Sequence, residues 1–227
     1  MKVCVALDLP TKEETLALIR TLKSEDIWLK VGLRSFIRDG EFLLKEIKNI
    51  NPNFKIFLDL KIHDIPNTMA DAAESIVGLG VDMFNVHASS GIKAMKTVME
   101  RVSHLPQKPI VLAVTALTSF DNASFEAIYK TPIAQKAIDF ARDAHNAGVH
   151  GVVCSVFESR AIKASTSEVF LTLTPGIRPF GESHDDQERV ADLARAKAEL
   201  SDFIVVGRPI YQNSDPLGVV QKIIENI

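Results

Sequence analysis

The sequence predicts an α/β protein, a single (β/α)8 TIM barrel spanning residues 1–227, with its functional site at the carboxyl ends of the strands. Short β-rich runs alternate with longer amphipathic stretches along the whole chain. The alternation gives eight strand–helix units, and repeated units of this kind form parallel strands with right-handed crossovers. No linker or low-complexity segment divides the chain, so we expect one domain.

The predicted strands are short and mostly apolar, and they are Lys2–Leu9, Ile27–Val31, Phe54–Lys61, Asp82–His87, Pro109–Thr115, Gly151–Ser155, Val169–Thr174 and Phe203–Val206. The predicted helices follow them in turn, and they are Lys12–Lys23, Ser35–Asn49, Thr68–Leu79, Gly91–Val102, Pro132–Ala147, Glu158–Ala164, Glu188–Ala198 and Pro216–Glu225. A doubly wound open sheet is the alternative, but no G-x-G-x-x-G follows the first strand.

Composition narrows the possible functions. The formal net charge is −3 at pH 7, which argues against a general affinity for nucleic acid or anionic membranes. Cys4 and Cys154 lie in apolar runs and no cluster has zinc spacing, so we expect buried thiols and no metal site. The first apolar run, which ends at Asp8, is too short for a signal peptide or a membrane span. These features predict a cytoplasmic protein.

Charged side chains collect where the predicted strands end. Asp8 ends the first strand and Lys30 lies in the second. Asp59 and Lys61 end the third strand and should face the same side, because side chains alternate with period two; Asp64 follows in the turn. Closing a barrel brings these ends around one mouth, which predicts a functional cluster. The alternative is a solvated loop with a surface ion pair.

The ends of the seventh and eighth strands predict a phosphate site, the usual position in this fold. Gly207 lets the backbone approach an anion, and Arg208 supplies a forked cation. Arg178 and Gln187 lie in the segment 175–187, which is typical of a lid between glycine hinges and could bring both to the same phosphate. The alternatives are a turn glycine beside a surface arginine, and a surface loop without contacts.

Two histidines near these strand ends have no assigned role. His63 should point away from Lys61, which favours packing over catalysis. His87 fits equally well at the mouth or in a core layer.

The motifs resemble those of orotidine 5′-phosphate decarboxylases over the whole chain. The segment DLKIHDIPNT at 59–68 matches the signature of the bacterial type. The remaining motifs recur in order: ALD at 6–8, LKVG at 29–32, NVHAS at 85–89, LTS at 117–119, TPGIRP at 174–179, DQ at 186–187 and GRP at 207–209.

This resemblance implies decarboxylation of orotidine 5′-phosphate to UMP, the last step of de novo pyrimidine synthesis, without metal or organic cofactor. It implies a charged tetrad of Lys30, Asp59, Lys61 and Asp64. Lys61 would stabilise and protonate a carbanion at C6 of the pyrimidine. The implied substrate contacts are Asp8 and Lys30 to the ribose, Thr118 to the pyrimidine, and Arg178, Gln187, Gly207 and Arg208 to the phosphate. A homodimer is also implied, in which Asp64 and Thr68 reach the neighbouring site.

Two other functions remain open at this point. A metal-dependent phosphosugar decarboxylase or aldolase of the same superfamily would require magnesium, although the complete motifs at 59–68 and 174–179 argue against it. A non-catalytic nucleotide-binding barrel would bind UMP without turnover, but it has no need of alternating lysines and aspartates at the mouth.

Overall fold

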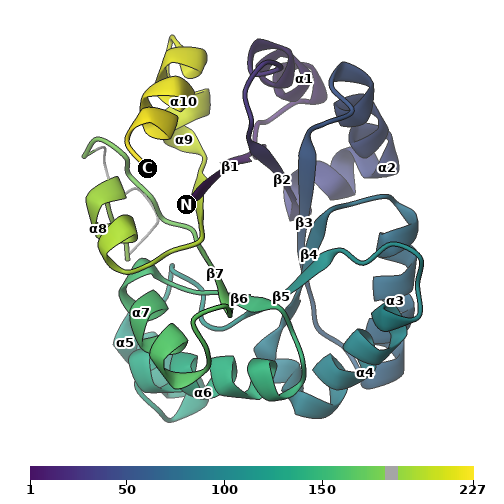
Figure 1. Ribbon diagram of the computed structural model, residues 1–227, viewed down its shortest axis with the longest axis vertical. Coiled ribbons are helices and arrows are strands. Elements are labelled where there is room, and N and C mark those ends of the chain that lie inside the picture. Colours follow the sequence, from purple (N-terminus) through teal and green to yellow (C-terminus); the bar gives the residue numbers. More distant parts are fainter. Residues whose placement is uncertain (182–188) are drawn as a thin grey trace.

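The computed structural model describes residues 1–181 and 189–227. Eight parallel strands close into a barrel in sequence order, with the last strand paired to the first. The helices surround the barrel as an outer ring (Figure 1). The predicted (β/α)8 barrel is therefore confirmed.

The strands are β1 (Lys2–Ala6), β2 (Trp28–Gly32), β3 (Lys55–Ile62), β4 (Met83–His87), β5 (Ile110–Val114), β6 (Gly151–Val153), β7 (Leu171–Thr174) and β8 (Phe203–Val206). The helices are α1 (Lys12–Thr21), α2 (Leu33–Ile50), α3 (Pro66–Gly78), α4 (Gly91–Ser103), α5 (Asn122–Tyr129), α6 (Ile133–Asn146), α7 (Val156–Ser165), α8 (Leu193–Ala198), α9 (Arg208–Tyr211) and α10 (Pro216–Glu225). A 3-10 turn, Ala88–Ser90, precedes α4. None of the helices described is long and apolar enough to cross a membrane.

The barrel interior is apolar at its centre and charged near the carboxyl ends of the strands. Trp28 and Phe57 belong to the apolar layer, which fills the barrel. Lys30 and Asp59 lie two residues further along the same strands, and alternation therefore turns them to the same interior. The strands thus place charged side chains directly above the packed apolar layer that contains Trp28 and Phe57.

The observed helices differ from the prediction after β5, β7 and β8. Helices α5 and α9 were not predicted. The helix predicted from Glu188 begins at Leu193 instead, because Ala191 forms a bridge with Ile177 and Asp192 caps the helix. Glu188 itself lies outside the described residues.

Strand β3 is irregular where its charged residues lie. Leu58 pairs with Phe84 of β4, and the next pair is Ile62 with Val86, so β3 advances four residues while β4 advances two. Lys61 lies in this bulge and has a φ of 54°, in the left-handed region that a residue other than glycine seldom adopts. The bulge redirects the end of β3 and places the Lys61 side chain.

Candidate active site

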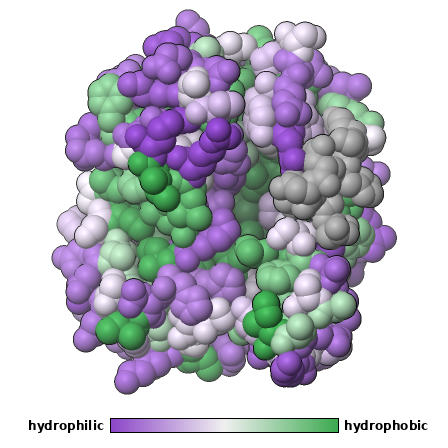
Figure 2. All heavy atoms as spheres, turned by 180° about the vertical axis from the view of Figure 1, so that it is seen from behind, coloured by the Kyte–Doolittle hydropathy of each residue, from purple (hydrophilic) through white to green (hydrophobic). Residues whose placement is uncertain are grey.

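A cavity of about 460 Å³ opens at the carboxyl ends of the barrel strands. This volume falls within the usual range for small-molecule sites, roughly 300–1,000 Å³. Figure 2 shows a hollow in the centre of this face, where hydrophilic and hydrophobic surfaces meet. Among the described residues, the charged groups that line the cavity are Lys30, Lys61, Arg178, Arg208, Asp8 and Asp59. Cations outnumber carboxylates here, which suits an anionic ligand in a protein whose net charge is negative.

An alternating row of lysines and aspartates crosses one side of the cavity. The Nζ atom of Lys30 lies 3.2 Å from both carboxylate oxygens of Asp8 and 3.5 Å from Oδ2 of Asp59. The other oxygen of Asp59 accepts a hydrogen bond of 2.6 Å from Nζ of Lys61. Lys30 and Asp59 are buried, whereas Lys61 is partly exposed to the cavity. The row therefore ends in an ammonium that a ligand can reach.

Mutual attraction keeps the buried members of this row charged. Burial alone would lower the pKa of Lys30, but Asp59 and Asp8 outweigh it and raise that pKa above its usual value. Burial alone would raise the pKa of Asp59. Lys30, Lys61 and the hydrogen bonds from Lys61 and Asn85 outweigh it and hold the pKa below the usual range. A lysine and a carboxylate thus stay ionised inside the barrel.

Asn85 of β4 fixes the geometry of the neighbouring pair. Its Nδ2 donates a hydrogen bond of 2.8 Å to Oδ1 of Asp59, and its Oδ1 accepts one of 2.7 Å from the backbone N–H of Lys61. Asn85 is completely buried. One amide therefore positions both the Asp59 carboxylate and the left-handed backbone of Lys61.

Gly32 at the end of β2 leaves room for the Asp8–Lys30 pair. A Cβ atom at this position would lie 2.9 Å from Oδ1 of Asp8 and 2.9 Å from Nζ of Lys30. Such a contact is closer than side chains tolerate, so any larger residue would displace the charged ends of both side chains. Glycine is needed here for space and not for its backbone angles.

Asp64 and Thr68 are exposed and are not among the described residues that line the cavity. The Asp64 carboxylate accepts a hydrogen bond of 2.7 Å from the N–H of Ile65. Within the part of the chain that the structure describes, Lys61 forms its ion pair with Asp59 and not with Asp64. Thr68 lies in the first turn of α3 and faces solvent. The cavity is therefore built without these two side chains within one chain.

The side of the cavity at the ends of β7 and β8 carries the predicted phosphate residues that the structure describes. Arg178 is buried and donates a hydrogen bond of 3.2 Å to the Ile177 carbonyl. Gly207 and Arg208 also line the cavity, and a Cβ at position 207 would lie 3.3 Å from Cβ of Ala6. Gln187, which completes the predicted group, lies outside the described residues.

The loop after β5 supplies a third side of the cavity. Thr118 is buried there, and its neighbours Leu117 and Ser119 also line the cavity and are exposed to it. Val114 and Val153 add apolar surface deeper in the barrel. An apolar wall with one buried hydroxyl suits a flat heterocycle better than a second phosphate.

His63 and His87 stack on each other beside the row, with ring centroids 5.6 Å apart and planes 15° apart. Nδ1 of His87 accepts a hydrogen bond of 3.2 Å from the N–H of Ser89. Burial, with His63 and Lys61 nearby, lowers the pKa of His87 to about 4. His87 is therefore neutral near pH 7. Neither histidine is among the residues lining the cavity.

The sequence placed the strand-end charges correctly around one mouth but missed several supporting residues. Asn85 entered the prediction only as the first residue of the motif at 85–89, although its place two residues after the interior Met83 turns it inward. Gly32 and Ser119 belong to the motifs at 29–32 and 117–119, but nothing in the sequence assigned either of them a role. Tyr211 also lines the cavity, and it lies in no motif that the sequence offered. The described residues contain no group of three or more His, Cys, Asp or Glu side chains arranged to hold a metal ion.

Comparison with known proteins gives consistent matches along the whole chain. Residues 1–223 match the "Orotidine 5'-phosphate decarboxylase / HUMPS family". Proteins named orotidine 5′-phosphate decarboxylase from Sulfurimonas denitrificans and Nitratiruptor are each 63% identical over 227 residues, covering 100% of both chains. The crystal structure of orotidine 5′-phosphate decarboxylase from Lactobacillus acidophilus superposes with a TM-score of 0.86 at 34% identity, covering 99% of this chain and 98% of that one.

Proposed function

This chain belongs to the orotidine 5′-phosphate decarboxylase / HUMPS family, and we propose that its barrel mouth converts orotidine 5′-phosphate to UMP through a C6 carbanion that Lys61 stabilises and protonates. The relatives that are 63% identical to the chain are named orotidine 5′-phosphate decarboxylase, which is a carboxy-lyase, and this identity supports the same class for the chain. The observation that carries the mechanism is the Lys61 ammonium, which reaches the cavity while Asp59 holds it at 2.6 Å.

The residues on the three sides of the cavity fit the three parts of this substrate. Arg178, Gly207 and Arg208 suit the 5′-phosphate, because two guanidinium groups and an open backbone face the same space. We assign Gln187 to the same phosphate group from its position in the sequence motif at 186–187. Thr118 suits a polar edge of the pyrimidine. Asp8 and Lys30 lie between the phosphate side and Lys61, where the ribose would sit.

In the proposed step the bond between C6 and the carboxylate breaks, and its electron pair remains on C6. The Lys61 ammonium lies where that negative charge develops and gives it a proton, which yields UMP and a neutral amine that solvent reprotonates. Asp59 would crowd the departing carboxylate. Two unit charges about 4 Å apart interact by about 4 kcal/mol at an effective dielectric near 20. Enzymes lower barriers by about 8–23 kcal/mol, so most of the effect must come from the preorganised cation.

We also infer that two copies of the chain complete each other's sites. Asp64 and Thr68 are exposed and do not line the cavity, and large apolar side chains are exposed at the starts of the helices that follow β2, β3 and β4. Leu33, Ile65 and Ile92 adjoin the starts of α2, α3 and α4 and are 48%, 67% and 41% exposed. Exposed apolar side chains at the same end of the barrel as the Asp64 carboxylate suit a symmetric dimer in which Asp64 approaches the partner's Lys61. The reaction would be the last step of de novo pyrimidine synthesis, in the cytoplasm.

The test is turnover of orotidine 5′-phosphate, followed by the loss of ultraviolet absorbance, on metal-stripped protein in EDTA. Rapid conversion to UMP is the expected result. A requirement for added magnesium before any turnover is seen would favour the alternative, a metal-dependent phosphosugar enzyme of the same superfamily. Binding of UMP by folded protein without turnover under either condition would favour a nucleotide-binding barrel and contradict the proposal.

A further inference from the structure

Arg189 lies outside the cavity but contacts the loop that forms one of its walls. Its Nη2 donates hydrogen bonds of 3.2 Å to the Leu117 carbonyl and 3.5 Å to the Ala116 carbonyl. Its backbone N–H donates to the Thr118 carbonyl at 3.4 Å. Three consecutive carbonyl groups of the loop after β5 therefore meet one arginine.

The same arginine is anchored to a buried carboxylate on a different element. Its Nη1 forms an ion pair with Oε1 of Glu158 in the first turn of α7. Glu158 is only 5% exposed, and its other oxygen accepts a hydrogen bond of 2.9 Å from the N–H of Ser155. Burial raises the pKa of Glu158, and Arg189 acts against that shift by favouring the charged form. The carboxylate therefore forms a fixed support for the guanidinium.

The backbone of Arg189 is tied in turn to the phosphate side of the cavity. Ile177 and Ala191 form a parallel bridge. The N–H of Arg178 donates to the Ala191 carbonyl at 2.9 Å, and the N–H of Ala191 donates to the Gly176 carbonyl at 3.1 Å. Arg189 is two residues from this bridge. The bridge therefore links the backbone that carries Arg178 to the backbone that carries Arg189.

We propose that Arg189 is a positioning residue that couples the phosphate side of the cavity to the loop carrying Thr118. This inference rests on the proposed function, because it takes Arg178 as a phosphate contact and Thr118 as a pyrimidine contact. A guanidinium has five donors in a rigid plane, so it can hold the Glu158 carboxylate and two carbonyl groups together. A lysine ammonium at the same place can pair with the Glu158 carboxylate, but it cannot also donate to the two carbonyl groups in the same plane.

The test compares Arg189→Lys with the wild type on two substrates, orotidine 5′-phosphate and orotidine, which lacks the phosphate. The variant keeps a positive charge beside Glu158 and so preserves the fold. We expect kcat/KM for orotidine 5′-phosphate to fall about 10- to 100-fold, and that for orotidine to fall less than about threefold, since a small misplacement of a positioned group can cost about 100-fold. A merely structural role would lower both values in proportion, and equal losses would overturn the inference.

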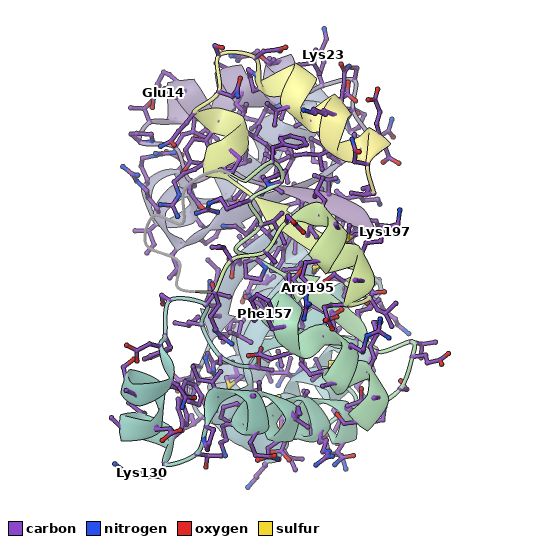
Figure 3. All side chains as sticks on the ribbon, turned by 90° about the vertical axis from the view of Figure 1, so that its left-hand side faces the viewer. Glu14, Lys23, Lys130, Phe157, Arg195 and Lys197 are labelled. Atoms are coloured by element: carbon purple, nitrogen blue, oxygen red, sulfur yellow. The ribbon has the colours of Figure 1, made fainter. Side chains whose placement is uncertain are left out.

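Arg195→Lys is the matched control, because Arg195 lies six residues further along the same segment. Arg195 lies on α8, pairs at 2.8 Å with Glu199 just after that helix, and lies over the ring of Phe157 on the outer surface (Figure 3). Its substitution should leave both kcat/KM values unchanged. The double variant Glu158→Gln/Arg189→Gln removes the buried charges together and should show the same selective loss as Arg189→Lys.

The two proposals fail in distinguishable ways. If the wild type does not convert orotidine 5′-phosphate, the proposed function fails and the coupling fails with it. Suppose that the wild type converts orotidine 5′-phosphate. If the ratio of kcat/KM for orotidine 5′-phosphate to kcat/KM for orotidine is then the same in Arg189→Lys as in the wild type, only the coupling is overturned. A wild-type ratio of these two kcat/KM values in the folded Glu158→Gln/Arg189→Gln variant would also overturn the coupling.

Discussion

The ammonium of Lys61 lies 2.6 Å from the Oδ1 atom of Asp59, two residues earlier in the same strand. The two side chains meet on one side, as alternation predicts, but the strand between them is not regular: β3 bulges between Leu58 and Ile62, and Lys61 has a left-handed backbone. Such a backbone conformation costs of order 1–3 kcal/mol and persists only where surrounding contacts enforce it. The buried amide of Asn85 supplies one such contact by accepting from the Lys61 N–H, and it also donates to the Asp59 carboxylate that holds the Lys61 ammonium.

Asn85→Ala should therefore weaken both stability and catalysis. The change removes the partners of a buried backbone N–H and of the Asp59 carboxylate, and we expect a loss of about 1–3 kcal/mol in the free energy of unfolding. We also expect kcat to fall at least about tenfold, because Lys61 is released from its position. Urea unfolding and steady-state kinetics measure the two effects. Asn49→Ala, which removes a surface contact to Glu46, is the control, and a normal kcat in Asn85→Ala would contradict the role of Asn85.

Gly32→Ala should separate activity from stability. The added Cβ would lie 2.9 Å from Oδ1 of Asp8 and from Nζ of Lys30, and both are the far ends of side chains that can move. We expect a change below about 1 kcal/mol in the free energy of unfolding. The displaced charges should lower kcat/KM by up to about 100-fold. Thermal melting and kinetics on the same sample test this expectation, and it is wrong if activity is retained in full.

The free energy of unfolding should fall more steeply with decreasing pH in the wild type than in Asp59→Asn. The pKa of Asp59 is held below its usual range in the folded protein, so this carboxylate stabilises the fold above its unfolded pKa of about 3.9. That contribution is lost as the pH falls from about 4 through the folded pKa. Urea unfolding at several pH values below 5 should show a flatter dependence in the variant. Equal slopes would mean that Asp59 is not held ionised by its neighbours.

The sequence predicted the barrel and the cavity charges because both follow from regular repeats. Side chains alternate with period two along each strand, which places Lys30 and Asp59 in the interior, and closure of the barrel brings the carboxyl ends of their strands together. The shared side of Asp59 and Lys61 was predicted, but the bulge of β3 between them could not be, since it depends on the pairing of β3 with β4. The Arg189–Glu158 pair joins residues that are 31 positions apart in the chain. No local pattern connects them.

A mixture of two inactive variants tests whether Asp64 serves the partner subunit. If Asp64 reaches across a dimer, a hybrid of Lys61→Ala and Asp64→Ala subunits has one site with both defects and one intact site. Random reassembly of equal amounts should then restore about a quarter of the wild-type activity in a two-fold symmetric dimer. Should the mixture remain as inactive as its components although hybrids form, Asp64 acts within its own chain.

Turnover of orotidine 5′-phosphate by Lys61→Ala is the most direct test of the account. Lys61 is partly exposed and at the end of its strand, so the variant should fold normally, as circular dichroism can verify. Lys55→Ala is the matched control, because Lys55 begins the same strand and pairs with Asp82 far from the cavity. We predict that Lys61→Ala loses nearly all kcat while Lys55→Ala keeps it. Near-normal kcat in folded Lys61→Ala protein would contradict the central claim that this ammonium stabilises and protonates the carbanion.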